Sequence, residues 1–317
     1  MTTIRLRDIS PRLAFQAHPA STAQKVELVE RLMAAGLQAI EVSSFVHPKL
    51  VPGLADAEQV FAQVKRRPGV SLECCVANVA GLKRAIAAGA DAAWFLLAAD
   101  EGFSKANIGR TIDESLAELA QMQDVAAASG IRLGTYLIGA FGGPIGLARG
   151  PEEVRGVAQR LMRMGVRDWI LADSCGYAAP PQIQEMVAFA DGLNGAEHLT
   201  VQVHDSRGMG LANVAELARL GLRNVDVSLA GSGAHPAAPG IRVGGVCSED
   251  AVQMLHLMGI DTGIDLPLLI ETANWLDDIL GGTALGFTRR IGAVPVNVRE
   301  LAAQQAIGGA FQWRPAQ

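Results

Sequence analysis

The sequence has few cysteines, few aromatic residues and no excess of positive charge, and these shortages exclude several classes of protein. Its 317 residues include only four cysteines, and aromatic residues make up 5%. The cysteines have neither zinc-site spacing nor the density of a disulfide-linked secreted domain. Basic residues number 27 against 32 acidic ones, a net charge of −5, whereas nucleic-acid binders usually carry a basic excess. We therefore expect no nucleic-acid partner and no disulfide scaffold.

Long apolar runs are also absent, although half of the residues are hydrophobic. No stretch approaches the roughly 18 apolar residues that a membrane-spanning helix requires. The first eleven residues are polar and include Arg5, Arg7 and Asp8, which is not the pattern of a signal peptide. These features predict a cytoplasmic protein that makes no membrane contact.

What the sequence does contain is a repeated alternation of short apolar runs and amphipathic stretches. The runs are rich in Val, Ile, Leu and Ala throughout, which is typical of parallel strands covered on both faces. We predict strands at Ile4–Ile9, Ala39–Val42, Ser71–Val76, Ala92–Ala98, Arg132–Ile138, Asp168–Ala172, Leu199–His204 and Asn224–Leu229. We predict helices between them at Ala23–Ala35, Ala55–Lys65, Val79–Ala88, Ile112–Ser129, Pro151–Met164, Pro180–Asp191 and Leu211–Leu220.

Eight strand-and-helix units of this length predict an α/β protein with a (β/α)8 TIM barrel. An open, doubly wound sheet is the main alternative. No linker interrupts the repeat, so we expect a single domain over residues 1–317. The barrel should span about 4–259 and a C-terminal helical extension about 260–317, with helices at Leu266–Leu280 and Val298–Gln305.

Polar residues gather just after the predicted strands. The active site of a TIM barrel lies at the carboxyl ends of its strands, so these residues are the candidates for chemistry. Individually, each could equally be a helix cap or a salt-bridge partner, but as a group they favour an enzyme. They are Asp8, Arg12, Glu41, Ser43, Ser44, Asn78, Asp173, His204 and Asp205.

The segment Gln202-Val203-His204 ends the seventh predicted strand. Residues two apart on a strand point to the same side, so Gln202 and His204 should both project into the barrel. Two histidines in this pattern would indicate a metal site, whereas glutamine at the first position leaves only a weak signal. A single histidine at a strand end is more often a hydrogen-bonding group than a ligand.

Two glycine-rich segments, Gly231-Ser232-Gly233 and Gly244-Gly245, follow the eighth predicted strand. Loops at this place in a barrel often bind a phosphate or a thioester. The sequence has no P-loop, no dinucleotide fingerprint and no Gly-x-Ser-x-Gly motif. A serine hydrolase is therefore disfavoured.

Several longer motifs resemble 3-hydroxy-3-methylglutaryl-CoA lyases, a family of barrel metallolyases. The resemblance covers residues of about 4–280, and its motifs are specific for the family rather than for one reaction. They are the segment from Ala35 to Asp56, Phe103–Ile108, Leu171–Gly176, His204-Asp205 and Ala230–Gly233.

The resemblance implies a retro-Claisen cleavage of a 3-hydroxyacyl-CoA assisted by a divalent metal ion. In the family that ion is held by an Asp, two His and an Asn, whose positions here are Leu13, Gln202, His204 and Gly245. Three of the four ligands are thus replaced, so we expect no metal site of the usual form and no required cofactor. A Mg or Mn ion held by Asp8, Gln202 and His204, with His235 as a further ligand, is the alternative.

The resemblance also assigns roles to individual residues. Arg12 would stabilise the enolate oxygen, His204 or His235 would be the general base, and Glu41 or Asp173 would orient the base or the substrate hydroxyl. The expected substrate-binding residues are Ser43, Ser44, Asn78, Gln202, Gly231 and Gly233. His235 occupies the place of a reactive loop cysteine in the family.

The leading hypothesis is a divergent carbon–carbon lyase that acts on a small acyl-CoA or related hydroxy acid, as a homodimer. One alternative is a catalytically silent paralogue that binds a CoA ester or serves as a structural subunit. The other is altered chemistry, such as hydrolysis or decarboxylation, on an acyl-CoA.

Overall fold

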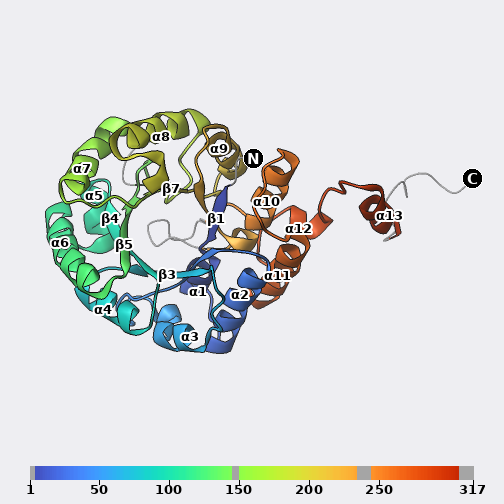
Figure 1. Ribbon diagram of the computed structural model, residues 1–317, viewed down its shortest axis with the longest axis horizontal. Helices are drawn as coiled ribbons and strands as arrows, with labels where there is room; N and C mark the ends of the chain where they lie inside the picture. The colour runs from blue at the N-terminus through green and yellow to red at the C-terminus, as the bar shows by residue number, and fades with distance from the viewer. Residues whose placement is uncertain (1–3, 145–149, 234–243, 307–317) are drawn as a thin grey trace, which may run out of the picture.

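The chain folds into a closed barrel of eight parallel strands. The computed structural model describes residues 4–144, 150–233 and 244–306. The strands follow one another around the barrel in sequence order, and β8 closes the barrel by pairing with β1 (Figure 1). Their bounds are β1 Arg5–Asp8, β2 Ala39–Ser44, β3 Ser71–Val76, β4 Ala92–Ala98, β5 Arg132–Ile138, β6 Trp169–Ala172, β7 Leu199–Gln202 and β8 Asn224–Val227. The predicted TIM barrel is confirmed, and the open doubly wound sheet is wrong.

Helices surround the barrel and cover the outer face of the strands (Figure 1). The helices that precede β8 are α1 Ser10–Ala17, α2 Thr22–Ala34, α3 Ala57–Gln63, α4 Val79–Ala87, α5 Glu101–Phe103, α6 Ile112–Ser129, α7 Pro151–Arg163, α8 Pro180–Asn194 and α9 Gly210–Arg219. Those that follow it are α10 Ser248–Leu257, α11 Leu266–Ile279, α12 Thr288–Ile291 and α13 Val298–Ala306. Short 3-10 segments lie at Pro52–Leu54, Ala196–His198 and Leu229–Gly231, and a π-helical segment at Ser104–Ile108.

Local sequence signals determine where several helices begin and end. Ser21 caps α2 and Thr111 caps α6, each in a reciprocal capping box that satisfies two backbone N–H groups. Gly130 ends α6 at φ 77°, a left-handed conformation that favours glycine. The strands between the helices are almost entirely buried, as their uniformly apolar composition predicts.

The structure departs from the predicted elements at several places. β7 ends at Gln202 rather than at His204, which forms an isolated antiparallel bridge to Gly245 where the chain leaves the barrel. No helix was predicted over α1, which has only eight residues and contains Pro11 in its first turn. Helix α10 lies in a stretch for which no helix was predicted, and its first turn follows directly on the glycine-rich segment.

Arg7 of β1 lies inside the barrel and joins carboxylates from two other strands. Its guanidinium donates to both oxygens of Asp226 on β8, at 2.8 and 2.6 Å, and to Oε2 of Glu73 on β3 at 2.9 Å. It also donates to the hydroxyl of Tyr136 on β5, at 2.6 Å, across the barrel interior. All four side chains are buried, so each charge depends on its partners rather than on water.

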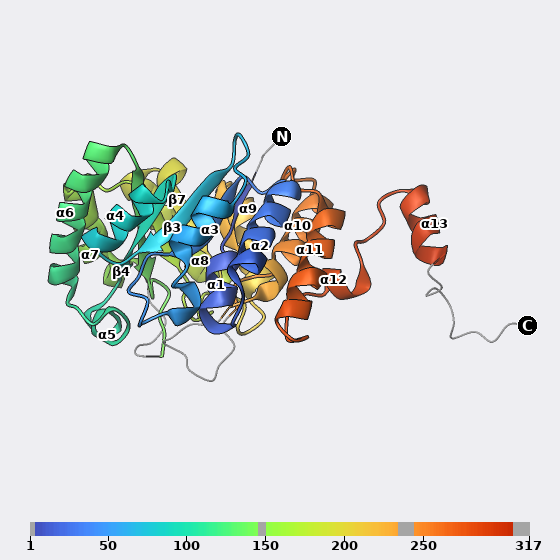
Figure 2. The ribbon, with the colours of Figure 1, turned by 90° about the horizontal axis from the view of Figure 1, so that it is seen from below.

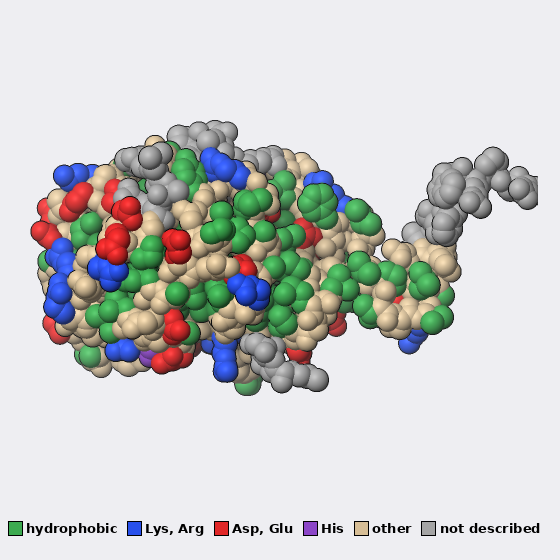
Figure 3. All heavy atoms as spheres, turned by 90° about the horizontal axis from the view of Figure 1, so that it is seen from above, with side chains coloured by type: hydrophobic (Ala, Val, Ile, Leu, Met, Phe, Trp, Pro, Cys, Tyr) green, Lys and Arg blue, Asp and Glu red, His purple; other side chains and the backbone are tan. Residues whose placement is uncertain are grey.

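After α10 the chain packs α11 against α2 of the barrel, and only the residues beyond α12 project away from it (Figure 2). The backbone N–H of Phe287 donates to Asp250 of α10, and that of Val294 donates to Gln253 of the same helix. Beyond these contacts α13 lies apart from the barrel (Figure 2), and hydrophobic side chains gather on this projecting segment (Figure 3). The exposed apolar residues on it are Phe287, Ile291, Val294, Val296, Val298 and Leu301.

Among the helices of the described ranges, none combines the length and the apolar character that a membrane crossing requires. The projecting helix α13 has nine residues and no buried side chain.

Replacing Arg7 tests how far the barrel interior depends on it. Arg7→Met should lower the free energy of unfolding by about 3–5 kcal/mol, because it leaves the carboxylates of Asp226 and Glu73 buried without their cation. Urea unfolding followed by circular dichroism measures the loss. Arg5→Met is the matched control on the same strand, and its exposed side chain should change stability by no more than about 0.5 kcal/mol. Equal effects of the two changes would contradict the role given to Arg7.

Candidate active site at the mouth of the barrel

A cavity of about 550 Å³ opens at the carboxyl ends of the strands. Its walls come from the ends of five strands and from the loops that follow them. The lining side chains include four basic residues and several amides but, among the described residues, no Asp or Glu. They are Arg12, Leu13, Gln16, Ser44, Val46, His47, Leu50, Val51, Cys75, Ala77, Asn78, Leu96, Asn107, Ile108, Arg110, Tyr136, Ile138, Ser174, Gln202 and His204. This composition suits a ligand with negative charge or exposed oxygen atoms.

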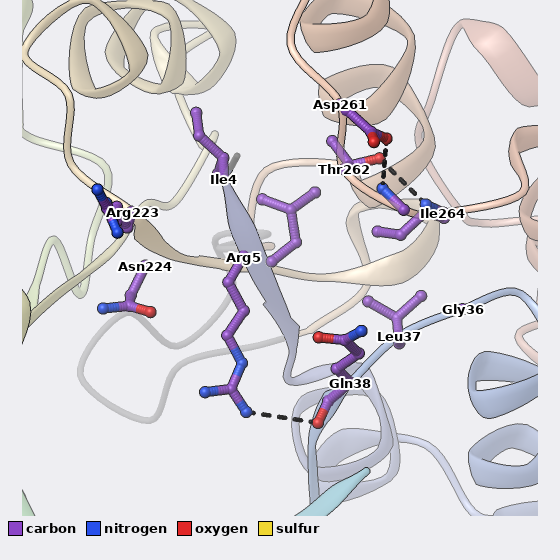
Figure 4. Close-up of a pocket in the computed structure, with 12 residues that line it drawn as sticks. Ile4, Arg5, Gly36, Leu37, Gln38, Arg223, Asn224, Asp261, Thr262 and Ile264 are labelled. Atoms are coloured by element: carbon purple, nitrogen blue, oxygen red, sulfur yellow. Dashed lines mark hydrogen bonds between the residues drawn. The ribbon is translucent and has the colours of Figure 1, made fainter. Parts of the chain in front are cut away.

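A second cavity, of about 420 Å³, lies at the opposite end of the barrel (Figure 4). It is lined by residues that precede or begin strands, among them Arg5, Gln38 and Arg223. Arg5 makes only a long contact there, 3.5 Å to the carbonyl of Gln38. Active sites of TIM barrels lie at the carboxyl ends of the strands, so the cavity at the barrel mouth is the candidate active site.

Arg12, in α1, is held at the mouth by the buried carboxylate of Glu41 on β2. Its Nε donates to Oε2 of Glu41 at 2.6 Å, while Oε1 accepts from the hydroxyl of Tyr136 at 2.7 Å. Burial by itself raises the pKa of Glu41, but Arg12 and then Arg7 outweigh it and the pKa lies below its usual value. Glu41 is therefore ionised and anchors Arg12 beside the cavity, which Arg12 lines and Glu41 does not.

Asp173 follows β6 and is fully buried. Burial raises its pKa to about 7, although backbone N–H groups from Tyr177, Ala178 and Gly176 lower it. Oδ1 accepts from the N–H of Tyr177 at 2.7 Å, and Oδ2 has no hydrogen-bond partner within the described part of the chain. The carboxyl group thus changes charge near neutral pH at a position directly behind Ser174, which lines the cavity.

Gln202 and His204 both line the cavity, as the alternation along β7 predicts. Both are buried, with 4% and 1% of their surfaces exposed. Among the described residues, the Nε2 group of Gln202 has no hydrogen-bond partner. A buried amide donor that lacks a partner is costly, and this one lies at the cavity wall.

The positions that correspond to the other family ligands lie around the same region. Leu13 lines the cavity, packs close to Gly233 and has no atom that can bind a cation. At Gly245 an added Cβ would lie 2.7 Å from the Cβ of Ser228, which is closer than real contacts allow. Across residues 4–144, 150–233 and 244–306, no three His, Cys, Asp or Glu side chains come together as possible ligands of one ion.

The structure brings some of the other predicted residues to the cavity and places the rest elsewhere. Ser44 and Asn78 line it, and Asn78 also caps α4 by accepting from the N–H of Gly81. Ser43, Gly231 and Gly233 are not among the lining residues. His235 lies outside the described residues.

Asp8 does not line the cavity either. Its carboxylate accepts from the N–H of Ser10 at 2.8 Å and from the hydroxyl of Ser248 at 2.5 Å. One oxygen of Asp8 therefore holds the start of α1 and the other the start of α10, and Asp8 is not part of the cavity wall that Gln202 and His204 line.

Several polar residues of the cavity were not among the candidates from the sequence, including Tyr136, Cys75, Arg110 and His47. Tyr136 and Cys75 stand inside predicted strands, where only the inward alternation along a barrel strand distinguishes them from core residues. Arg110 donates to the carbonyl of Ala77 and follows the π-helical segment, and nothing in the sequence pattern indicates that this segment turns toward the barrel.

Comparison with known proteins gives one consistent family. The HMGL-like family model matches residues 4–276. The (R)-citramalyl-CoA lyase of Chloroflexus aurantiacus is 33% identical over 95% of this chain and 99% of its own. The hydroxymethylglutaryl-CoA lyase YngG of Bacillus subtilis is 31% identical over 88% of this chain and 93% of its own.

Solved structures agree with these relatives. An HMG-CoA lyase from Acinetobacter baumannii, in complex with coenzyme A and 3-methylmalate, has a TM-score of 0.88 and 30% identity. The match covers 93% of this chain and 98% of that one. The hydroxymethylglutaryl-CoA lyase of Pseudomonas aeruginosa has a TM-score of 0.87 at 32% identity, over 91% of this chain and 97% of its own.

The pKa of Asp173 predicts how stability changes with pH. Because its pKa is about 7 in the folded chain and about 3.9 in an unfolded one, the folded state keeps a proton that the unfolded chain has lost between these values. The stability that this bound proton contributes to the folded state is fully present below pH 4 and is lost as the pH rises through 7. Asp173→Asn should therefore gain stability over the wild type between pH 5 and pH 8.5, by up to about 4 kcal/mol.

Urea unfolding at several pH values measures the difference between the two proteins. Asp124→Asn, at an exposed position on α6, should follow the wild-type pH dependence. If the difference between Asp173→Asn and the wild type were the same at pH 5 and pH 8.5, Asp173 would not be the titrating group.

Proposed function

The chain belongs to the HMGL-like family, and from that premise we propose that it cleaves a carbon–carbon bond in a small 3-hydroxyacyl-CoA or related hydroxy acid. The observation that carries the proposal is the convergence of Arg12, Gln202 and His204 on one cavity at the barrel mouth, with Glu41 holding Arg12. A TIM barrel needs no such group of buried polar side chains for stability. Citramalyl-CoA and hydroxymethylglutaryl-CoA lyases among its relatives support a CoA ester as substrate.

We further propose that the reaction proceeds without the metal site that the family resemblance implies. Leucine and glycine offer no side-chain donor at positions 13 and 245, and Ser228 leaves no room for a side chain at 245. Gln202 and His204 alone provide too few ligands for a hard divalent ion. The residues present therefore do not fit the family's divalent ion, and the proposed reaction uses no metal ion.

The cleavage then depends on two groups of this chain. His204, whose imidazole lines the cavity and can act as a general base, takes the proton of the 3-hydroxyl group as the bond between C2 and C3 breaks. C3 becomes the carbonyl carbon of the released keto acid, and the bonding electrons move to the CoA fragment as an enolate. Arg12 stabilises the enolate oxygen with its permanent charge, and the protonated base returns the proton to C2.

A catalytically silent protein that binds a CoA ester is the second candidate function. It is favoured by the same three substitutions at positions 13, 202 and 245, because a family member that loses its ion also loses several kcal/mol of Lewis-acid assistance. The two candidates differ in turnover rather than in binding. Thermal-shift and product assays with citramalyl-CoA and hydroxymethylglutaryl-CoA, in buffer treated with EDTA, therefore separate them.

The proposal predicts a large effect at Arg12. Arg12→Lys should lower turnover at least about a hundredfold, on the scale of losing one preorganised oxyanion donor, and should leave the circular dichroism spectrum unchanged. Release of the CoA product measures turnover. Arg84→Lys is the matched control, because its Nε also donates to a single carboxylate at 2.6 Å but lies outside the cavity.

Three results would contradict parts of this proposal. Near-normal turnover in Arg12→Lys would remove Arg12 from the mechanism. One bound divalent ion per purified chain would overturn the proposal of a metal-independent site. Stabilisation by an acyl-CoA without any turnover would favour the silent binder.

A homodimer in the cytoplasm also belongs to this proposal. The apolar side chains on the projecting C-terminal segment, from Phe287 to Leu301, support a partner surface. Sedimentation velocity should give the mass of two chains, and removal of residues 287–317 should reduce it to one. A wild-type mass of one chain would exclude the dimer.

A further inference from the structure

Gln202 lines the cavity and combines near-complete burial with an amide donor that has no hydrogen-bond partner among the described residues. Its surface is 4% exposed, and its Nε2 donates to no protein atom. The position is fixed from the backbone, because the Gln202 carbonyl accepts from the N–H of Asp173 at 3.0 Å. The side chain is thus held at the cavity wall, and its amide N–H groups remain available to a ligand atom there.

The chemistry of the neighbouring groups determines what that ligand atom is. Arg12, Arg110, His47 and His204 line the cavity, and no described carboxylate does. An amide N–H needs an acceptor, and in this environment the favoured acceptor is an oxygen that carries negative charge. Carbonyl and carboxylate oxygens of a hydroxy acid or keto acid meet both requirements.

We infer that Gln202 replaces a metal ligand with a direct contact, and that its Nε2 donates a hydrogen bond to a carboxylate or carbonyl oxygen of the hydroxy-acid part of the ligand. In this arrangement the amide and the guanidinium of Arg12 together bind oxygen atoms that a cation would otherwise bind. The inference rests on the proposed function only for the location of the ligand. Gln202 is thus a binding residue that makes recognition of the acid independent of a divalent ion.

Oxalate is a suitable probe, because it presents adjacent carboxylate oxygens and cannot undergo the cleavage. Isothermal titration in buffer with EDTA should show that the wild type binds oxalate. Gln202→Met keeps the length of the side chain but removes the donor, and should raise the Kd about 10- to 100-fold. Gln16→Met, the same change elsewhere on the cavity wall, should change the Kd less than about twofold.

A structural role for Gln202 would give a different result in a second measurement. Because the amide lacks a partner in the ligand-free protein, Gln202→Met should keep or raise the Tm while it weakens oxalate binding. A lowered Tm with unchanged oxalate affinity would overturn the inference, as would a wild type that binds oxalate only when a divalent ion is added.

The outcome is separate from that of the proposed function. If the wild type binds oxalate through Gln202 but releases no CoA product, the inference stands and the lyase proposal fails. If product forms at the same rate and oxalate binds equally well in Gln202→Met, the lyase proposal stands and the inference fails.

Discussion

The buried carboxylate of Glu41 lies where the polar interior of the barrel meets the cavity, and both depend on it. One oxygen accepts from Arg12 at the mouth and the other from Tyr136, whose hydroxyl in turn accepts from Arg7 deeper in the barrel. Removing the charge of Glu41 would leave Arg12 without its hydrogen-bonded carboxylate. It would also remove one of the negative charges that surround the buried Arg7. The position of Arg12 at the cavity and the charge pairing inside the barrel therefore both depend on this one fully buried carboxylate.

The same arrangement explains why the cavity is basic although the chain is acidic overall. Three described carboxylates near the mouth make their contacts away from the cavity: Glu41 with Arg12 and Arg7, Asp8 with Ser10 and Ser248, and one oxygen of Asp173 with the N–H of Tyr177. Burial also raises the pKa of Asp173 to about 7, which reduces its negative charge near neutral pH. An anionic ligand therefore meets cations and amide donors without nearby carboxylates to repel it.

The sequence predicts the barrel well because its signals are local and repeated. Apolar runs, capping residues such as Thr111 and terminal glycines such as Gly130 each act within a few residues, and eight repeats make the architecture clear. The approach of Arg12 to Glu41 joins residues 29 apart, and that of Arg7 to Asp226 joins residues 219 apart. No local pattern indicates such pairs, so Tyr136 and Arg110 were missed and Asp8 was expected closer to the chemistry than it lies.

The residues that replace the family's metal ligands at the barrel mouth are consistent with the local backbone packing, most clearly at position 245. Gly245 is required by packing, because the loop that contains it runs along β8: the N–H of Ser228 donates to the carbonyl of Val246 at 2.9 Å. An added Cβ at Gly244 would lie 1.9 Å from the carbonyl oxygen of Gly231, and one at Gly245 would lie 2.7 Å from the Cβ of Ser228. A metal-binding side chain at position 245 would therefore require the loop to move, in addition to a different residue.

Leu13 packs against the neighbouring Gly233 on the same side of the mouth. An apolar contact is therefore found at the position where the resemblance implies a charged metal ligand. Of the four positions, only 202 and 204 keep polar side-chain atoms on the cavity wall, and the proposed recognition of an oxygen-rich ligand depends on these atoms.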